Sequence, residues 1–363
     1  MNFQDEFRDR SLVRNMADNI HAMAACLTAP VNFMEVCGTH TMAIYQYGIR
    51  SLLPENVRLI SGPGCPVCVT PVEYVDKAIA CAADPANIVA TFGDMLRVPG
   101  SRSSLMEERA KGADVRIVYS PRDAVALAQA NPQRLVIFLG VGFETTTPTI
   151  AASIMEAAQR GLENYCVLAS HKTIPIPMEV LTADPELALS GYLCPAHVST
   201  VIGGNAYKPL AEQFHIPCVV TGFEPADVMQ GIEMLLAQIL ARESRVEIQY
   251  SRAVTWEGNP RARAVMAEVF EPCDAAWRGL GVLPGTGLAI RSELAAFDAE
   301  KALAIQVPEG KENPACQCGE VLKGKLAPFA CPLFATACTP ESPVGACMVS
   351  SEGTCAAAYK YGR

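Results

Sequence analysis

The sequence lacks the features that mark a nucleic-acid-binding or membrane-spanning protein. No basic run occurs, and 29 Lys and Arg residues against 38 Asp and Glu residues give a net charge of −9. We therefore expect no nucleic-acid partner. No apolar run approaches the roughly 20 residues of a membrane-spanning helix, so we expect no membrane partner. The first residues, Met1-Asn-Phe-Gln-Asp-Glu-Phe-Arg-Asp-Arg10, are charged where a secretory signal would be apolar, and we expect a cytoplasmic protein.

Signatures of common cofactor sites are also missing. Neither a complete Gly-x-Gly-x-x-Gly pattern nor a Walker A pattern occurs, so the sequence does not support a bound nucleotide. Cysteine, by contrast, is abundant at 15 residues, an odd number. A reducing cytosol does not maintain structural disulfides, so these thiols favour a metal, a cluster or redox chemistry. Four of them lie in apolar runs and are expected to be ordinary core residues: Cys26, Cys81, Cys166 and Cys218.

Strand and helix patterns alternate from residue 31 to about residue 240. This alternation predicts an α/β protein with two doubly wound, Rossmann-like parallel sheets, one in residues 31–120 and one in residues 121–240. Residues 241–363 are expected to form a smaller, mostly helical Cys-rich domain. An amphipathic helix in residues 11–27, within the N-terminal segment 1–30, packs against that domain or against the first sheet.

Three loops that carry reactive side chains follow predicted strands: Cys37-Gly-Thr-His-Thr41, Gly64-Cys-Pro-Val-Cys68 and Gly142-Phe-Glu-Thr-Thr-Thr-Pro148. Ligands of open parallel sheets bind beyond the carboxyl ends of the strands. We therefore expect these loops to lie on one rim and to form one site.

The pair Cys65 and Cys68 stands between a short strand and a predicted helix start, with Thr70 as N-cap and Pro71 as first helical residue. The helix end should stabilise a thiolate there. Redox chemistry is the favoured interpretation, a zinc half-site and a purely structural role being the alternatives. A second Cys-x-x-Cys pair at zinc-knuckle spacing is absent. The same pattern of cap, proline and acidic residue recurs at Ser120-Pro-Arg-Asp123.

Cys37 and His40 offer a thiolate beside an imidazole. Such a pair binds a soft or borderline metal or acts as nucleophile and base. The alternative is a half-buried cysteine with a histidine that caps the loop.

Glu144, followed by Thr145 and Thr146, is predicted at a helix N-terminus, where it could hold an anion or orient a proton donor. Simple helix capping explains the pattern equally well. The same alternative applies to three further polar residues: Asp94, Arg97 and His197.

Six cysteines gather near the C-terminus: Cys316, Cys318, Cys331, Cys338, Cys347 and Cys355. Cys331 precedes a proline, as cluster ligands often do. The spacing favours a metal or a cluster over inert thiols but fits neither the ferredoxin nor the zinc-ribbon rule. A [4Fe–4S] cluster and a zinc ion bound by sulfur alone therefore both remain open.

Together these stretches resemble the HypD family, which helps to assemble the Fe(CN)2CO group of [NiFe]-hydrogenases. The resemblance covers nearly the whole chain and rests on these motifs: Met34-Glu-Val-Cys-Gly-Thr-His-Thr41, Gly62-Pro-Gly-Cys-Pro-Val-Cys68, Phe92-Gly-Asp-Met-Leu-Arg-Val-Pro-Gly100, Gly142-Phe-Glu-Thr-Thr146, and the tail from Cys318-Gly-Glu-Val-Leu to Ser350-Ser-Glu-Gly-Thr-Cys355.

The resemblance implies a role for each cysteine motif. Cys37, with His40 beside it, would hold the iron together with a cysteine of the small partner HypC. Cys65 and Cys68 would be a redox dithiol. A second partner, HypE, would deliver cyanide as a thiocyanate on its own C-terminal cysteine. A [4Fe–4S] cluster would be held by four cysteines, with Cys316 and Cys347 as non-ligands: Cys318, Cys331, Cys338 and Cys355.

This interpretation describes a redox-active assembly factor rather than a conventional turnover enzyme. Two other classes remain open from the sequence. One is a free-standing, [4Fe–4S]-dependent thiol–disulfide oxidoreductase that acts on a small molecule. The other is a zinc-stabilised binding module with inert thiols.

Overall fold

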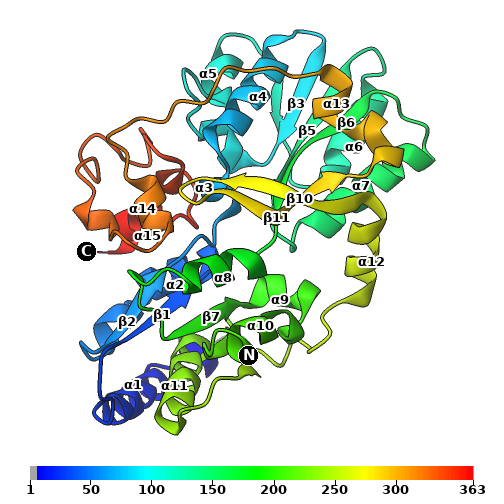
Figure 1. Ribbon diagram of the computed structural model, residues 1–363. Helices are drawn as coiled ribbons and strands as arrows, with labels where there is room; N and C mark the ends of the chain where they lie inside the picture. Colours follow the sequence, from blue (N-terminus) through cyan, green and yellow to red (C-terminus); the bar gives the residue numbers. More distant parts are fainter. Residues whose placement is uncertain (1–5, 363) are drawn as a thin grey trace.

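The computed structural model describes residues 6–362 and contains two β-sheets, both dominated by parallel strands and flanked by helices (Figure 1). The predicted mixed α/β class with two Rossmann-like units is confirmed. A Cys-rich C-terminal segment packs against α2 (Gly38–Gln46) and α3 (Pro66–Val69) (Figure 1). No helix within the described residues is long and apolar enough to cross a lipid bilayer.

The first sheet has the strand order β2-β1-β7-β8-β9, and all its pairings are parallel. Successive residues of β1, Phe33 and Met34, lie in different buried clusters, so helices and loops cover both faces of the sheet. Its strands are β1 Val31–Glu35, β2 Val57–Ser61, β7 Gly191–Pro195, β8 Cys218–Thr221 and β9 Val246–Ile248. The helices around it are α1 Arg10–Ala24, α2 Gly38–Gln46, α8 Pro175–Thr182, α9 Ala196–Ile202, α10 Lys208–Glu212 and α11 Pro225–Ala241.

The second sheet has the order β10-β11-β6-β5-β3-β4, in which β10 and β11 form an antiparallel hairpin at one edge. Its strands are β3 Asn87–Thr91, β4 Val115–Ile117, β5 Leu135–Gly142, β6 Tyr165–Lys172, β10 Phe270–Trp277 and β11 Gly281–Ile290. The associated helices are α4 Val72–Ala83, α5 Leu105–Ala110, α6 Pro121–Ala130, α7 Thr147–Gln159, α12 Pro260–Val269 and α13 Ala299–Leu303. The predicted capping pattern at Ser120 and Asp123 is present as a capping box that begins α6.

The sheets do not follow the expected division at residue 120. The chain leaves the first sheet after β2, builds β3 to β6 of the second sheet, and returns to the first sheet with β7. Local strand and helix patterns do not say which sheet a strand joins, so a division along the sequence was the wrong inference. The hairpin β10–β11 was also missed, because its Gly- and Pro-rich sequence resembles a connection rather than strands.

The N-terminal helix α1 packs against α11 on the first sheet rather than on the Cys-rich segment (Figure 1). Ile20 of α1 shares a buried cluster with Ile232 and Leu235 of α11. Cys26, just beyond α1, is exposed rather than a core residue, whereas Cys81, Cys166 and Cys218 are buried as expected.

The Cys-rich segment consists of short helices joined by turns. The prediction of a mostly helical domain in residues 241–363 is therefore wrong. The helices of this segment are α14 Cys318–Leu322, η6 Pro328–Ala330, η7 Ala346–Met348 and α15 Thr354–Tyr361. Other single-turn helices are η1 Glu6–Arg8, η2 Ile49–Leu52, α3 Pro66–Val69, η3 Gly93–Arg97, η4 Gly204–Tyr207 and η5 Ser292–Phe297.

Candidate functional site

Two of the three predicted loops meet at the carboxyl ends of adjacent strands. β1 and β2 pair in parallel, and the Cys37 loop follows β1 while the Cys65 loop follows β2. The backbone N–H of Gly38 donates to the carbonyl of Gly64 at 3.0 Å. A Cβ atom on Gly64 would overlap the backbone of Cys37. The absence of a side chain at Gly64 is therefore what allows the two cysteine loops to touch.

The third loop does not share this rim, because Gly142 ends β5 of the other sheet. Phe143, not Glu144, connects it to the cysteine loops. The Phe143 side chain lies in one buried cluster with Val36, Cys65 and Cys68. The site therefore lies between two sheets and not along the edge of one.

Cys37 is the N-cap residue of α2 and is buried, with 8% of its surface exposed. Burial, and then the nearby carboxylate of Glu352, raise the pKa of the Cys37 thiol to about 12, although the backbone N–H groups of His40 and Thr39 act in the opposite direction. In the metal-free protein this cysteine is therefore a protonated thiol at neutral pH.

The buried carboxyl of Glu35 supports the Cys37 loop, and the sequence analysis did not identify it. Its Oε2 accepts the backbone N–H of Cys37 at 3.2 Å, and its Oε1 accepts the hydroxyl of Thr41 at 2.5 Å. Burial raises the pKa of Glu35 to about 7. An acidic residue at the end of a predicted strand, two positions before Cys37, was the sequence signal for this role.

His40 is fully buried and faces the first sheet rather than Cys37. Its Nε2 donates to the carbonyls of Thr221 and Gly222, both at 2.9 Å, and its ring lies 4.8 Å from that of Phe223. Nδ1 has no hydrogen-bond partner among the described residues, and burial lowers the pKa of His40 to about 4. The imidazole is therefore neutral and positions α2 against β8.

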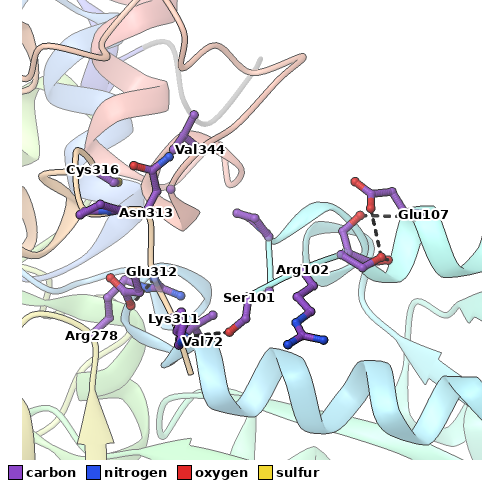
Figure 2. A pocket seen from close by; sticks show the side chains of 16 residues that line it. Val72, Ser101, Arg102, Glu107, Arg278, Lys311, Glu312, Asn313, Cys316 and Val344 are labelled. Atoms are coloured by element: carbon purple, nitrogen blue, oxygen red, sulfur yellow. Dashed lines mark hydrogen bonds and ion pairs between the residues drawn. The ribbon is translucent and has the colours of Figure 1, made fainter. Parts of the chain in front are cut away.

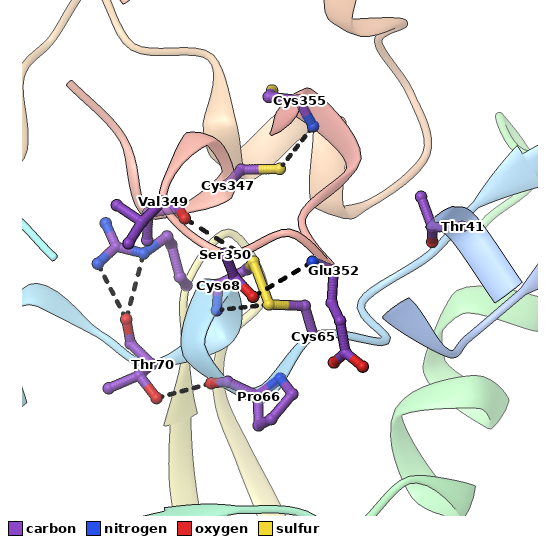
Figure 3. The surroundings of a disulfide bond; sticks show 12 residues. Thr41, Cys65, Pro66, Cys68, Thr70, Cys347, Val349, Ser350, Glu352 and Cys355 are labelled. Carbon is purple, nitrogen blue, oxygen red and sulfur yellow. Dashed lines mark hydrogen bonds between the residues drawn. A yellow bond between two sulfur atoms is a disulfide. The ribbon is translucent and has the colours of Figure 1, made fainter. Parts of the chain in front are cut away.

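Cys65 and Cys68 form a buried disulfide in the single-turn helix α3 (Figure 3). Cys65 itself is the N-cap of α3, and its Sγ accepts the backbone N–H of Cys68 at 3.2 Å. The prediction that Thr70 caps the next helix is wrong. The Thr70 hydroxyl donates back to the carbonyl of Pro66, and α4 begins at Val72 after Pro71.

The tip of the β10–β11 hairpin holds α3 in place. The backbone N–H of Arg278 donates to the carbonyl of Val69 at 2.8 Å. The guanidinium of Arg278 is buried and donates twice to the carbonyl of Thr70. This contact was missed with the hairpin itself.

The C-terminal segment closes over both cysteine loops (Figure 3). The hydroxyl of Thr39 donates to Glu352 Oε1 at 2.9 Å. A Cβ atom on Gly353 would lie 3.1 Å from Cys68 Sγ. Residues 352 and 353 therefore lie between Cys37 and the disulfide on one side and the C-terminal cysteines on the other.

Arg97 ties the C-terminal segment to the second sheet. Its guanidinium donates to the carbonyls of Pro340 and Val349, at 3.2 and 2.9 Å. The motif Phe92–Gly100 thus places the tail, and Asp94 and Arg97 line a surface pocket beside α15. His197 lies in the first-sheet unit instead, where its ring packs on that of Phe223 with ring centres 4.1 Å apart.

All six C-terminal cysteines line one small cavity of about 20 Å³: Cys316, Cys318, Cys331, Cys338, Cys347 and Cys355. A hydrogen bond with Cys318 raises the pKa of Cys316, and the pKa values of Cys318 and Cys347 are also raised, with neighbouring thiols among the causes. These three thiols therefore lie close together. The expected distinction between ligands and non-ligands is not visible in the cavity lining, because Cys316 and Cys347 contribute to it as well.

The cavity supplies thiols for either kind of centre that the sequence leaves open. A zinc ion takes four ligands around one centre, whereas each thiolate of a [4Fe–4S] cluster binds a different iron. Six thiols line the cavity, which is enough for either. Within residues 6–362, no three His, Cys, Asp or Glu side chains converge closely enough to hold one metal ion.

A pocket of about 580 Å³ lies next to this cavity (Figure 2). Arg278, Glu312 and Cys316 line one side of it, and Arg102 and Glu107 line the other. Arg278 forms an ion pair with Glu312 at 2.5 Å. The pocket gives solvent a route to the edge of the cysteine cavity at Cys316.

Glu144 is buried and bonds to the residue that precedes α8. Its Oε1 accepts the backbone N–H of Ile174 at 3.0 Å, and its Oε2 has no partner among the described residues. Burial raises the pKa of Glu144 to about 7. The hydroxyls of Thr146 and Thr147 donate to the carbonyl of Phe143 rather than to a ligand.

Comparison with known proteins gives the same assignment over the whole chain. Residues 11–362 match a family model described as "HypD: Hydrogenase formation hypA family". Hydrogenase maturation factor HypD of Azotobacter vinelandii is 49% identical over 100% of this chain and 97% of its own length. The protein of the same name from Rhizobium leguminosarum bv. viciae is 48% identical over 100% and 96%, and that of Escherichia coli K12 is 45% identical over 99% and 98%. The chain therefore belongs to the HypD family of hydrogenase maturation factors.

Proposed function

We propose that this chain holds an iron ion at Cys37, together with a cysteine of a small HypC-type partner, and supplies electrons while cyanide and carbon monoxide are attached to that iron. The observation that carries the proposal is the contact between the two cysteine loops, in which Gly64 packs directly on Cys37. The loop that carries the Cys37 thiol therefore touches the loop that carries the Cys65–Cys68 disulfide, which supports a joint role for the two.

Cys37 would bind the iron cargo as a thiolate. The metal replaces the thiol proton, which burial otherwise retains. Glu35 fixes the loop through the backbone N–H of Cys37. His40 acts as a positioning residue, since its hydrogen bonds anchor α2 to the carbonyls that follow β8.

Cys65 and Cys68 would store and release the electrons. Reduction of their disulfide takes up two electrons and two protons and gives two thiols. Reoxidation of the two thiols to the disulfide passes the two electrons on to the iron species bound at Cys37. The contact between the two loops supports such a transfer, and Arg278 holds the end of α3 through the carbonyl of Thr70.

The C-terminal cysteine cavity would hold a [4Fe–4S] cluster. All four predicted ligands line it: Cys318, Cys331, Cys338 and Cys355. A bound cluster supplies electrons one at a time. Gly353, which faces Cys68 Sγ, places the disulfide next to the cluster-holding segment. Cyanide would reach the iron from a transient HypE-type partner that carries it as a thiocyanate.

The test compares Cys37→Ala with the unmodified chain, both purified without oxygen in complex with the small partner. We expect Cys37→Ala to lose the partner-shared iron and iron transfer, while the cluster absorbance and about four irons with acid-labile sulfide remain. If absorbance and transfer vanish together, this division of roles is wrong. About one zinc and no labile sulfide would instead indicate a zinc-stabilised binding module. Thiol–disulfide turnover of a small molecule without partner proteins would indicate a free-standing oxidoreductase.

A further inference from the structure

A second pocket, of about 270 Å³, lies on the second sheet and is not part of the cysteine site. It opens between α4 and the strands β6, β11 and β10. Tyr74 and Lys77 of α4 line one wall, and Ser170, Lys172 and Cys273 line the sheet. Nothing in the proposed iron and electron chemistry uses these side chains.

Lys172 and Cys273 flank a glycine in one row across three strands. Gly287 of β11 pairs with Lys172 on one side and with Cys273 on the other. Residues paired across a sheet point to the same face, so the amine and the thiol share this face. A Cβ atom on Gly287 would lie 2.8 Å from Cys273 Sγ. The missing side chain therefore lets the Cys273 thiol lie over Gly287, in the row that also carries Lys172.

Lys172 is buried to 2% exposure without an acidic partner. None of the ion pairs in the described part of the chain includes it. Its Nζ donates to the hydroxyl of Ser170 at 3.0 Å and lies 5.8 Å from the ring centre of Trp277. Burying an unpaired ammonium costs free energy, so a lysine with only a structural role is rarely found in such a place.

The surroundings of Lys172 make its amine easier to deprotonate than that of an exposed lysine. Burial lowers the pKa of Lys172 to about 8; the nearby Cys273 acts in the opposite direction, and the Arg278 guanidinium acts in the same direction as burial. Tyr74 of α4 directs its hydroxyl to the carbonyl of Leu168. His171, on the adjacent position of β6, packs on Phe270 on the other face.

Each acidic side chain that lines the pocket has a partner other than Lys172. Lys77 pairs with Glu73 at 3.3 Å and with Glu300 at 2.8 Å. Asp298 pairs with Lys301 at 3.4 Å, and Asp274 accepts the backbone N–H of Gly285. Four acidic side chains and two lysines line the pocket, so the lining disfavours an anionic ligand and admits a neutral one.

We propose that Lys172 is a nucleophilic amine that captures a small aldehyde or ketone in this pocket as an imine. A desolvated lysine is the usual residue for this chemistry. The neutral Nζ adds to the carbonyl carbon, the C=O π bond breaks, and loss of one water leaves a C=N bond. Both amine hydrogens leave with the carbonyl oxygen, so no oxidant or reductant is needed. The Ser170 hydroxyl and the Cys273 thiol are placed to transfer the protons.

The experiment treats the intact chain with propanal and sodium cyanoborohydride at pH 7.5 and follows propylation of each lysine by peptide mass spectrometry. We expect Lys172 to react at least about tenfold faster than Lys77, which lies in the same pocket but is ion-paired and protonated. Because the rates are measured on the unmodified protein, the result does not depend on the folding of a variant. A Lys172 rate equal to or below that of Lys77 overturns the proposal.

Two variants check the assignment. Lys172→Arg should abolish the fast phase, and Lys77→Arg should leave it unchanged. Persistence of the fast phase in Lys172→Arg, or its loss in Lys77→Arg, would assign the reactive amine to another residue and overturn the proposal. Neither readout involves iron, a cluster or a partner protein, so the outcome is independent of the proposed maturation function.

Discussion

Gly64 packs against Cys37 so closely that a Cβ atom on Gly64 would lie 2.5 Å from the Cα atom of Cys37. This contact joins the two loops on which the proposed function depends. It also explains the glycine directly before Cys65, because the chain must pass the Cys37 backbone without a side chain before α3 begins.

Gly64→Ala should therefore separate the loops. The added methyl group meets backbone atoms, which cannot rotate away, and we expect a loss of about 1–3 kcal/mol in the free energy of unfolding. Iron loading at Cys37 should fall in parallel. Gly93→Ala is the matched control, since its nearest neighbour would be 3.9 Å away. Urea unfolding and iron analysis of both variants check the prediction; equal stability of the two would contradict it.

The chemistry-bearing loops were predictable from the sequence because reactive side chains that follow parallel strands gather at the strand ends. Cys37 and Cys65 obey this rule through adjacent strands. The position of Glu144 was not predictable, because β5 belongs to the other sheet and strand patterns do not specify sheet membership. Arg278 was missed because the hairpin that carries it is rich in glycine and proline, which weaken any strand signal.

Arg278→Met should loosen α3 around the disulfide. The substitution keeps much of the apolar volume but removes the two side-chain hydrogen bonds to the carbonyl of Thr70 and the ion pair with Glu312. We expect about 1–3 kcal/mol lower stability, because the Thr70 carbonyl is left without these donors. Dithiothreitol should reduce the Cys65–Cys68 disulfide faster.

Arg291→Met is the control for Arg278, since Arg291 is a half-exposed residue that pairs with Glu271 on the same sheet. Timed alkylation of the released thiols measures the reduction rate. If Arg278→Met and Arg291→Met give the same rate, the hairpin does not hold α3.

Arg97→Met should release the C-terminal segment. Its guanidinium supplies the hydrogen bonds to Pro340 and Val349, which flank Cys347 on the chain. We expect faster hydrogen exchange over residues 340–349 and a lower content of labile sulfide after cluster reconstitution. Arg102→Met, on an exposed position of the following loop, should change neither. Unchanged exchange in Arg97→Met would show that other contacts hold the segment.

Glu144 should give the protein a measurable pH dependence of stability. Its carboxyl is buried, and its pKa is raised from 4.5 to about 7. The folded state therefore binds a proton that the unfolded state has released between these values, and stability falls as the pH rises from 4.5 to 7. The full loss is about 3 kcal/mol, and it is absent below pH 4.5 and complete above pH 7.

Glu144→Gln should remove this contribution, since the amide stays neutral and its oxygen can still accept the N–H of Ile174. The difference in unfolding free energy between the unmodified chain and the variant should change by about 3 kcal/mol between pH 4.5 and pH 7.5. Taking this difference cancels the parallel titration of Glu35, which both chains retain. Glu163→Gln, at an exposed position after α7, should leave the profile unchanged. If Glu144→Gln follows the same pH profile as the unmodified chain, the Glu144 carboxyl is ionised in the folded protein, and its site is open to water rather than sealed beneath the start of α8.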